Sequence, residues 1–154
     1  MKGKHMKTVL FSLGALALLG LVVYITLAIM SQKAPDTLGL KGGKLAPCPE
    51  SPNCVCSEQV QPSDKEHFIQ AIQADKALWA KFKAIIQEQG AEIITDDDNY
   101  VHATFSTPVF HYVDDVELRF DEAEGLIHIR SASRMGRSDF GVNRKRAEKL
   151  KQAL

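Results

Sequence analysis

The stretch VELRFDEAEGLIHIRSAS, residues 116–133, decides the fold of this chain. Apolar and polar residues alternate in 116–120 and again in 126–133, a pattern typical of two strands that each have one buried face. The segment between them, DEAEG, ends in Gly125, which can adopt the positive φ that a tight connection needs. We therefore predict an antiparallel β-hairpin.

The pairing of these two strands predicts a charged face. If the apolar residues of both strands share one side, Glu117 lies opposite Arg130, and Arg119 lies opposite His128, on the other side. Opposite charges at facing positions stabilise a sheet, so a charge ladder explains this face structurally. We expect a sheet with one buried face.

The period of two continues upstream of the hairpin. Residues 91–95 and 100–106 flank the acidic turn 96–99 and form two further predicted strands. The sheet therefore has at least four strands in sequence order, which favours an antiparallel arrangement.

Apolar residues at helical spacing precede these strands and end at Gly90. They allow a single helix over 64–89, begun by a capping box at Ser63 and Glu66. They equally allow a helix over 75–89 with Asp75 as its N-cap, and 67–73 is then a short strand.

The chain ends in a basic segment that we expect to be helical. Ser138 or Asp139 can cap this helix, and the loop 131–138 brings arginines to its N-terminus. Helix N-termini favour anions, and guanidinium groups bind phosphates and carboxylates bidentately. The candidate ligand-binding residues are Arg130, Arg134, Arg137, Asp139, Asn143 and Arg144. The structural alternative is that Asp139 caps the helix while one arginine pairs with Asp114 or Asp115.

Histidines of the sheet suggest an enzyme as a second hypothesis, because imidazole and carboxylate groups serve acid–base and metal chemistry. The candidates are His102, His111 and His128, together with Asp114, Asp115 and Glu117. The sequence contains no nucleophile elbow, HExxH motif or glycine-rich phosphate loop. We expect no cofactor and no metal ion.

Cysteines occur in LAPCPESPNCVCSEQ, where prolines forbid a helix. A bridge between Cys48 and Cys54 would close a compact loop, with Cys56 left as a competing partner or a free thiol. A zinc site lacks a fourth ligand, and CxC is not the CxxC of thiol oxidoreductases.

Residues 31–44 are rich in Gly, Lys and Pro, so we expect a flexible tether. Before them, VLFSLGALALLGLVVYITLAIM, residues 9–30, is uncharged and as a helix spans about 33 Å, enough to cross a bilayer core of roughly 30 Å. Lysines in the flank 1–8 predict a cytoplasmic N-terminus. A cleavable signal peptide is the alternative, but the apolar region of a signal peptide is shorter than the run 9–30.

Several of these motifs resemble an uncharacterised bacterial family, domain of unknown function 1499. The matching text is CPESPNC at 48–54, YVDDVE at 112–117, RSASR at 130–134 and GRSDFGVNR at 136–144. The resemblance implies that Cys48 pairs with Cys54 and that the helix over 75–89 is preceded by a break. It implies no activity.

Together these patterns predict an α+β protein, with an N-terminal transmembrane helix followed by a small two-layer domain over 45–154. An antiparallel sheet of about four to five strands is packed by two helices. We expect a single-pass protein of the inner (cytoplasmic) membrane with a periplasmic or extracytoplasmic domain.

The predicted function is a binding module for an anionic ligand or lipid headgroup. The alternatives are a metal-dependent or acid–base hydrolase and a structural scaffold of the cell envelope that binds a protein partner. In the scaffold, Phe110 and Tyr112 either touch lipid or a partner or anchor their own loop. The chain has a formal net charge of zero, and a domain across the membrane would not meet nucleic acid.

Overall fold

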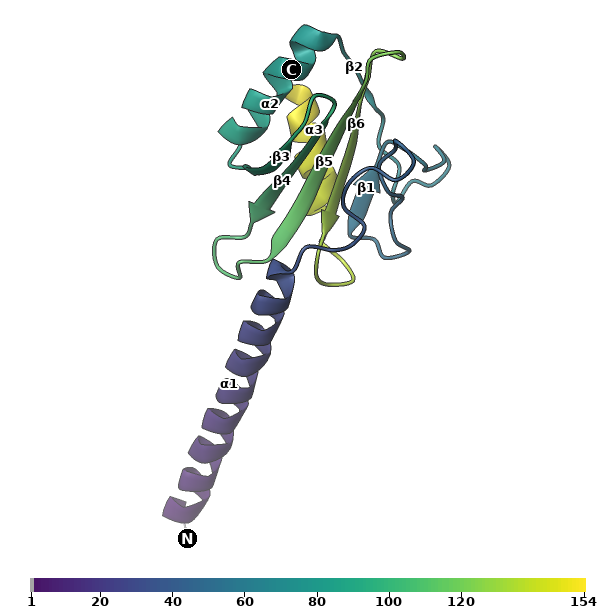
Figure 1. Cartoon of the computed structure of the whole chain (residues 1–154). Helices are drawn as coiled ribbons and strands as arrows, with labels where there is room; N and C mark the ends of the chain where they lie inside the picture. Colours follow the sequence, from purple (N-terminus) through teal and green to yellow (C-terminus); the bar gives the residue numbers. More distant parts are fainter. Residues whose placement is uncertain (1) are drawn as a thin grey trace.

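A long N-terminal helix and a separate domain make up the molecule (Figure 1). The computed structural model describes the backbone of residues 2–154 and the side chains from His5 onward, so the side chains of Lys2 and Lys4 in the predicted basic flank lie outside the described part. Helix α1 (Lys2–Gln32) contains the predicted span 9–30. Its segment His5–Gln32 is long and apolar enough to cross a membrane.

The domain is an antiparallel sheet with helices on one side, so the α+β prediction is confirmed. Its elements are β1 (Cys54–Cys56), β2 (Ile72–Gln73), α2 (Lys76–Glu88), β3 (Glu92–Asp96), β4 (Tyr100–Ser106), β5 (Val113–Asp121), β6 (Leu126–Ser133) and α3 (Val142–Gln152). The strand order is β1-β6-β5-β4-β3, and β2 also pairs with β6. The very short strands β1 and β2 extend the expected four to five strands to six, because both add to the free edge of β6.

The central hairpin has the predicted register. Glu117 lies opposite Arg130, and Arg119 lies opposite His128. The apolar residues of both strands therefore share the face that α2 and α3 cover.

The segment before α2 is broken, as the resemblance implied. Asp75 is the N-cap of α2 and accepts a hydrogen bond from the backbone N–H of Leu78. The alternative of one helix over 64–89 is wrong, because Ile72 pairs with Ile127 of β6 before the helix begins.

The core lies between the sheet and the two helices. Phe82 and Ile86 of α2, together with Leu150 of α3, are fully buried against Leu118 and Ile129 of the sheet. Each such side chain stabilises the fold by roughly 1.5–3 kcal/mol relative to an exposed position. The apolar pattern of the sequence therefore found the main core.

The opposite face of the sheet is also buried, which corrects the expectation of one buried face. Residues 33–53, which we call the cover segment, lie over it (Figure 1). Glu117 is 0% exposed and Arg130 is 4% exposed. The alternation of apolar and polar residues along the strands predicts a polar face, but it cannot show that a loop covers that face.

The stretch expected to be a flexible tether, 31–44, makes specific contacts with the sheet in this structure. Ser31 is buried, and its hydroxyl accepts a hydrogen bond from the N–H of Val113, 2.7 Å away. The N–H of Gly39 donates to Glu117 over 2.9 Å. These bonds fix the path of the chain between α1 and the domain.

Candidate functional site

Arg130, the first of the predicted ligand-binding residues, lies on the polar face of the sheet and pairs there with a carboxylate. Its Nη1 donates to Glu117 Oε2 over 2.8 Å. Glu117 also accepts hydrogen bonds from the hydroxyl of Tyr100 and the N–H of Gly39. Burial and the adjacent Glu117 carboxylate raise the pKa of Tyr100, so its hydroxyl keeps its proton and remains a donor. The charge of Arg130 is therefore neutralised inside the protein.

Arg134 joins the sheet to the end of α1. Its Nε and Nη2 donate to the two carboxylate oxygens of Asp115 over 2.8 and 2.7 Å. Its Nη1 donates to the backbone oxygens of Ser31 and Gln32. Burial alone would raise the pKa of Asp115, but hydrogen bonds from Arg134 and His102 hold that pKa below its usual value.

Hydrogen bonds within the protein occupy the next three predicted residues, Arg144, Asn143 and Asp139. Arg144 donates to the backbone oxygens of residues 65, 66 and 68. Asn143 is buried and donates to Asn53 O and Ser133 Oγ. Asp139 accepts the backbone N–H groups of residues 141 and 143 at the start of α3. The N-cap itself is Gly141 and makes no side-chain cap bond, so α3 begins later than a cap at Ser138 or Asp139 would place it.

Arg137 alone among the predicted arginines is exposed and has no recorded partner in the described part of the chain. The six residues therefore do not converge on one anion. The predicted register already placed Glu117 opposite Arg130, and the structural alternative already paired one arginine with Asp114 or Asp115. The structure identifies the arginine that bonds to Asp115 as Arg134.

The predicted catalytic residues do not converge either. His102 Nε2 lies 2.7 Å from Asp115 and is buried, whereas His111 is exposed in the loop before β5. Asp114 faces the helix side, where it accepts a hydrogen bond from Arg146 of α3 over 2.7 Å. Asp114 and Asp115 therefore belong to opposite faces of the sheet.

The Cys48–Cys54 disulfide is present, with a Cα–Cα distance of 5.6 Å. It closes the loop that leads into β1. Cys56 is a buried free thiol, and burial raises its pKa to about 11. Such a thiol is unreactive at neutral pH, so it is structural in this fold.

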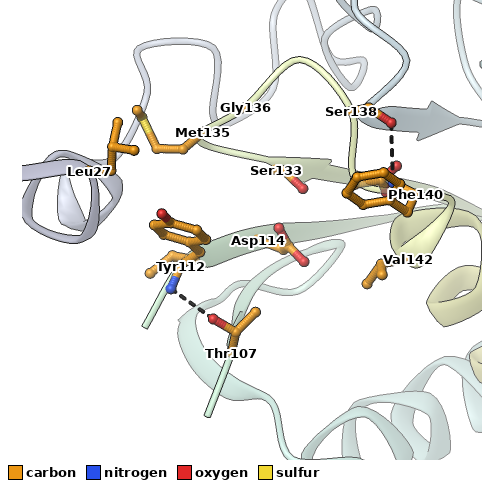
Figure 2. A pocket seen from close by; sticks show the side chains of 12 residues that line it. Leu27, Thr107, Tyr112, Asp114, Ser133, Met135, Gly136, Ser138, Phe140 and Val142 are labelled. Carbon is orange, nitrogen blue, oxygen red and sulfur yellow. Dashed lines mark hydrogen bonds between the residues drawn. The ribbon is translucent and has the colours of Figure 1, made fainter. Parts of the chain in front are cut away.

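An apolar cavity of about 330 Å³ lies at the end of the domain next to α1 (Figure 2). Leu27 of α1, Met135 and Tyr112 lie toward one side of it, and Phe140 and Val142 lie toward the other. The remaining lining residues are Thr107, Val113, Asp114, Ser133, Gly136, Ser138 and Asp139. The cavity is thus built jointly by the apolar helix and by the loops at one end of the sheet.

The carboxylates that line this cavity already accept hydrogen bonds. Asp114 bonds to Arg146, which compensates its charge, and Asp139 bonds to the backbone N–H groups of residues 141 and 143 at the start of α3. Asp139 therefore keeps its negative charge, although its acceptor atoms are satisfied. Arg137 is exposed and lies in the sequence between the lining residues Gly136 and Ser138, so the loop that borders the cavity carries a positive side chain, although that side chain does not line the cavity.

Aromatic contacts fix the loop 107–112 to the helix. The hydroxyl of Tyr24 donates to Val109 O over 2.7 Å, and the Tyr24 and Phe110 rings lie 5.6 Å apart. Phe110 in turn stacks on Tyr112, also at 5.6 Å. Phe110 and Tyr112 therefore anchor their loop, although to α1 and not to the core.

Apolar side chains remain exposed at the same end of the domain. Phe140 is 90% exposed and Val109 is 68% exposed. Neither this surface nor the cavity was predicted from the sequence. Phe140 lies between Asp139 and Gly141 in the sequence, and only the fold brings it to the same cavity as Leu27 of α1.

Residues 44–154 match the family described as Protein of unknown function (DUF1499), and the chain belongs to this family. The resemblance drawn from its motifs is thereby confirmed. No curated protein and no solved structure matches the chain. The family description assigns no activity.

Proposed function

We propose that the protein is a single-pass membrane protein of the cell envelope whose extracytoplasmic domain binds an anionic amphiphile, such as a phospholipid, at the bilayer surface. The observation that carries the proposal is the apolar cavity between α1 and the domain. Binding pockets are typically concave and mostly apolar, with a few polar groups that orient the ligand.

The position of Leu27 supports a ligand from the membrane. A hydrocarbon core of roughly 30 Å takes up about 20 helical residues, so a span that begins near Val9 ends close to Leu27. The cavity then opens at the edge of the hydrocarbon region. Tyr24 lies near the same level, where aromatic residues are enriched at membrane interfaces.

The exposed side chains around the cavity support the same placement. Val109 and Phe140 would enter the interfacial region beside α1, and their burial there removes apolar surface from water. The acyl chain of a lipid can then pass from the bilayer into the cavity without crossing water.

Arg137 supports a preference for an anionic headgroup. It is exposed in the loop that supplies the lining residues Gly136 and Ser138, and guanidinium groups bind phosphate oxygens bidentately. This retains the predicted anionic ligand but replaces the cluster of arginines by a single one.

Photocrosslinking tests the cavity. The full chain is placed in nanodiscs of phosphatidylcholine and phosphatidylglycerol that contain phosphatidylglycerol with a diazirine on one acyl chain. We expect labelled peptides from 133–142, the segment that lines the cavity. Val142→Trp fills the cavity and should remove this labelling, whereas Ile94→Trp, at an exposed apolar position on β3, should leave it unchanged. Equal labelling in wild type and Val142→Trp contradicts the proposal.

Lipid competition tests the headgroup. Arg137→Gln should lower the preference for phosphatidylglycerol over phosphatidylcholine, while Lys145→Gln, which removes an exposed charge on α3, should not. Protease added to the outer side of spheroplasts tests the orientation, because the domain should be degraded there and α1 protected. Protection of the domain would place it on the cytoplasmic side.

A further inference from the structure

The turn between β5 and β6, at the opposite end of the sheet from α1, gathers potential metal ligands. Asp121 ends β5, Glu124 lies in the turn, and His128 is in β6. One ligand atom from each of these residues lies within 4.8 Å of the others. Asp121 is two residues beyond Arg119, which pairs with His128, so both ligands project from the polar face.

The ring of His128 provides an independent sign of a ligand. The residue is 7% exposed, and its Nε2 has no hydrogen-bond partner among the residues that the structure describes. Its Nδ1 lies 3.4 Å from Ser57 Oγ, which orients the ring. A buried polar atom without a partner costs free energy, and coordination of a metal ion by Nε2 would satisfy it.

The charges around the ring favour a divalent cation. Glu58 Oε1 lies 4.0 Å from His128 Nε2, and Asp121 and Glu124 add two further carboxylates. The adjacent Arg119 bonds to both Glu58 and Asp121, so its charge is already compensated. Three carboxylates and one guanidinium leave a formal charge of −2.

Free lone pairs remain on these ligands. Asp121 accepts hydrogen bonds from Arg119 and from the N–H of Glu124, yet a carboxylate has about four acceptor sites.

We infer that Asp121, Glu124 and His128 form a binding site for a divalent transition-metal ion such as Zn²⁺ or Mn²⁺. Imidazole nitrogen together with carboxylate oxygen suits these ions. The site is independent of the cavity at α1, because the two lie at opposite ends of β5 and β6.

Titration calorimetry of the metal-free full chain in detergent, with ZnCl₂ and MnCl₂ separately, tests this inference. We expect one ion bound per chain for at least one metal. Glu124→Gln and His128→Gln should each weaken binding by at least about tenfold. The matched control is Glu122→Gln, which removes the same charge in the same turn, where Glu122 pairs with Lys76.

Three results would overturn the site: absence of one-to-one binding for both metals, unchanged affinity in Glu124→Gln, or equal weakening in Glu122→Gln. Glu124 is exposed, so its substitution leaves the fold intact even if His128→Gln unfolds the domain. The Glu124→Gln result alone therefore decides between a built site and metal bound by the other histidines.

Discussion

On one face of the sheet Leu118 packs beneath α2 and α3, whereas on the other its neighbour Glu117 forms a buried ion pair with Arg130 beneath the cover segment. The first face is stabilised by apolar burial, which needs no particular partner. The second depends on each charged group finding its partner, because an unpaired buried charge is strongly destabilising. The two faces should therefore respond differently to substitution, acid and reduction.

The largest effect is expected on the polar face. Glu117→Ala leaves Arg130 buried without its partner and should lower the free energy of unfolding by about 3–5 kcal/mol. Urea unfolding of the full chain in detergent measures this loss. The double variant Glu117→Leu with Arg130→Met should recover most of it, because both charges are removed together. Failure of that recovery would show that contacts other than the ion pair dominate.

Leu118→Ala probes the helix face one residue away. The substitution leaves a cavity under α2 and α3 and should cost about 2–5 kcal/mol. Adding Arg130→Met should recover part of the loss in Glu117→Ala but deepen the loss in Leu118→Ala, because there it leaves Glu117 buried without its partner. Urea unfolding measures both changes, and a recovery in both variants would remove the distinction between the faces.

The disulfide constrains the cover segment and should contribute less than either face. Cys48 and Cys54 are separated by 6 residues, so the loop is short and the Cys48→Ala, Cys54→Ala double variant should lose about 2 kcal/mol. Thermal unfolding with and without reductant checks this. Reductant should lower the melting temperature of the wild type and leave the double variant unchanged.

Acid should weaken the polar face selectively. The pKa of Asp115 is held below its usual value of 3.8, so its stabilising contribution is complete above that pH and is lost as the pH falls through the lower pKa of the folded state. Asp115→Asn should be less stable at pH 7 and should lose stability less steeply below pH 3.8. Leu118→Ala keeps the wild-type pH profile. An equally steep acid limb in Asp115→Asn would contradict this assignment.

Apolar periodicity predicted the face of the sheet that packs against α2 and α3, because burial of an apolar side chain does not require one particular partner. The same periodicity set the register of β5 and β6 and thereby placed Glu117 opposite Arg130. It did not predict the cover segment, since residues 31–44 have no periodic pattern and are held by single hydrogen bonds such as that from Gly39 to Glu117.

The candidate site was less predictable than the fold. Arg134 and Arg137 have the same side chain and lie in the same loop, yet one is bonded to Asp115 and the other is exposed. That difference depends on which side chain reaches β5. The cavity likewise requires Leu27 and Phe140 to meet from distant parts of the sequence.

The bonds from Arg134 to the backbone of Ser31 and Gln32 have a mechanical consequence. Tyr24 and Gln32 make further hydrogen bonds to the loop 107–112, so α1 and the sheet are joined at several points. Transmembrane helices tilt when their apolar length exceeds the bilayer thickness. In the proposed membrane placement, a thinner bilayer would tilt α1, and the domain would rotate with the helix as one rigid unit.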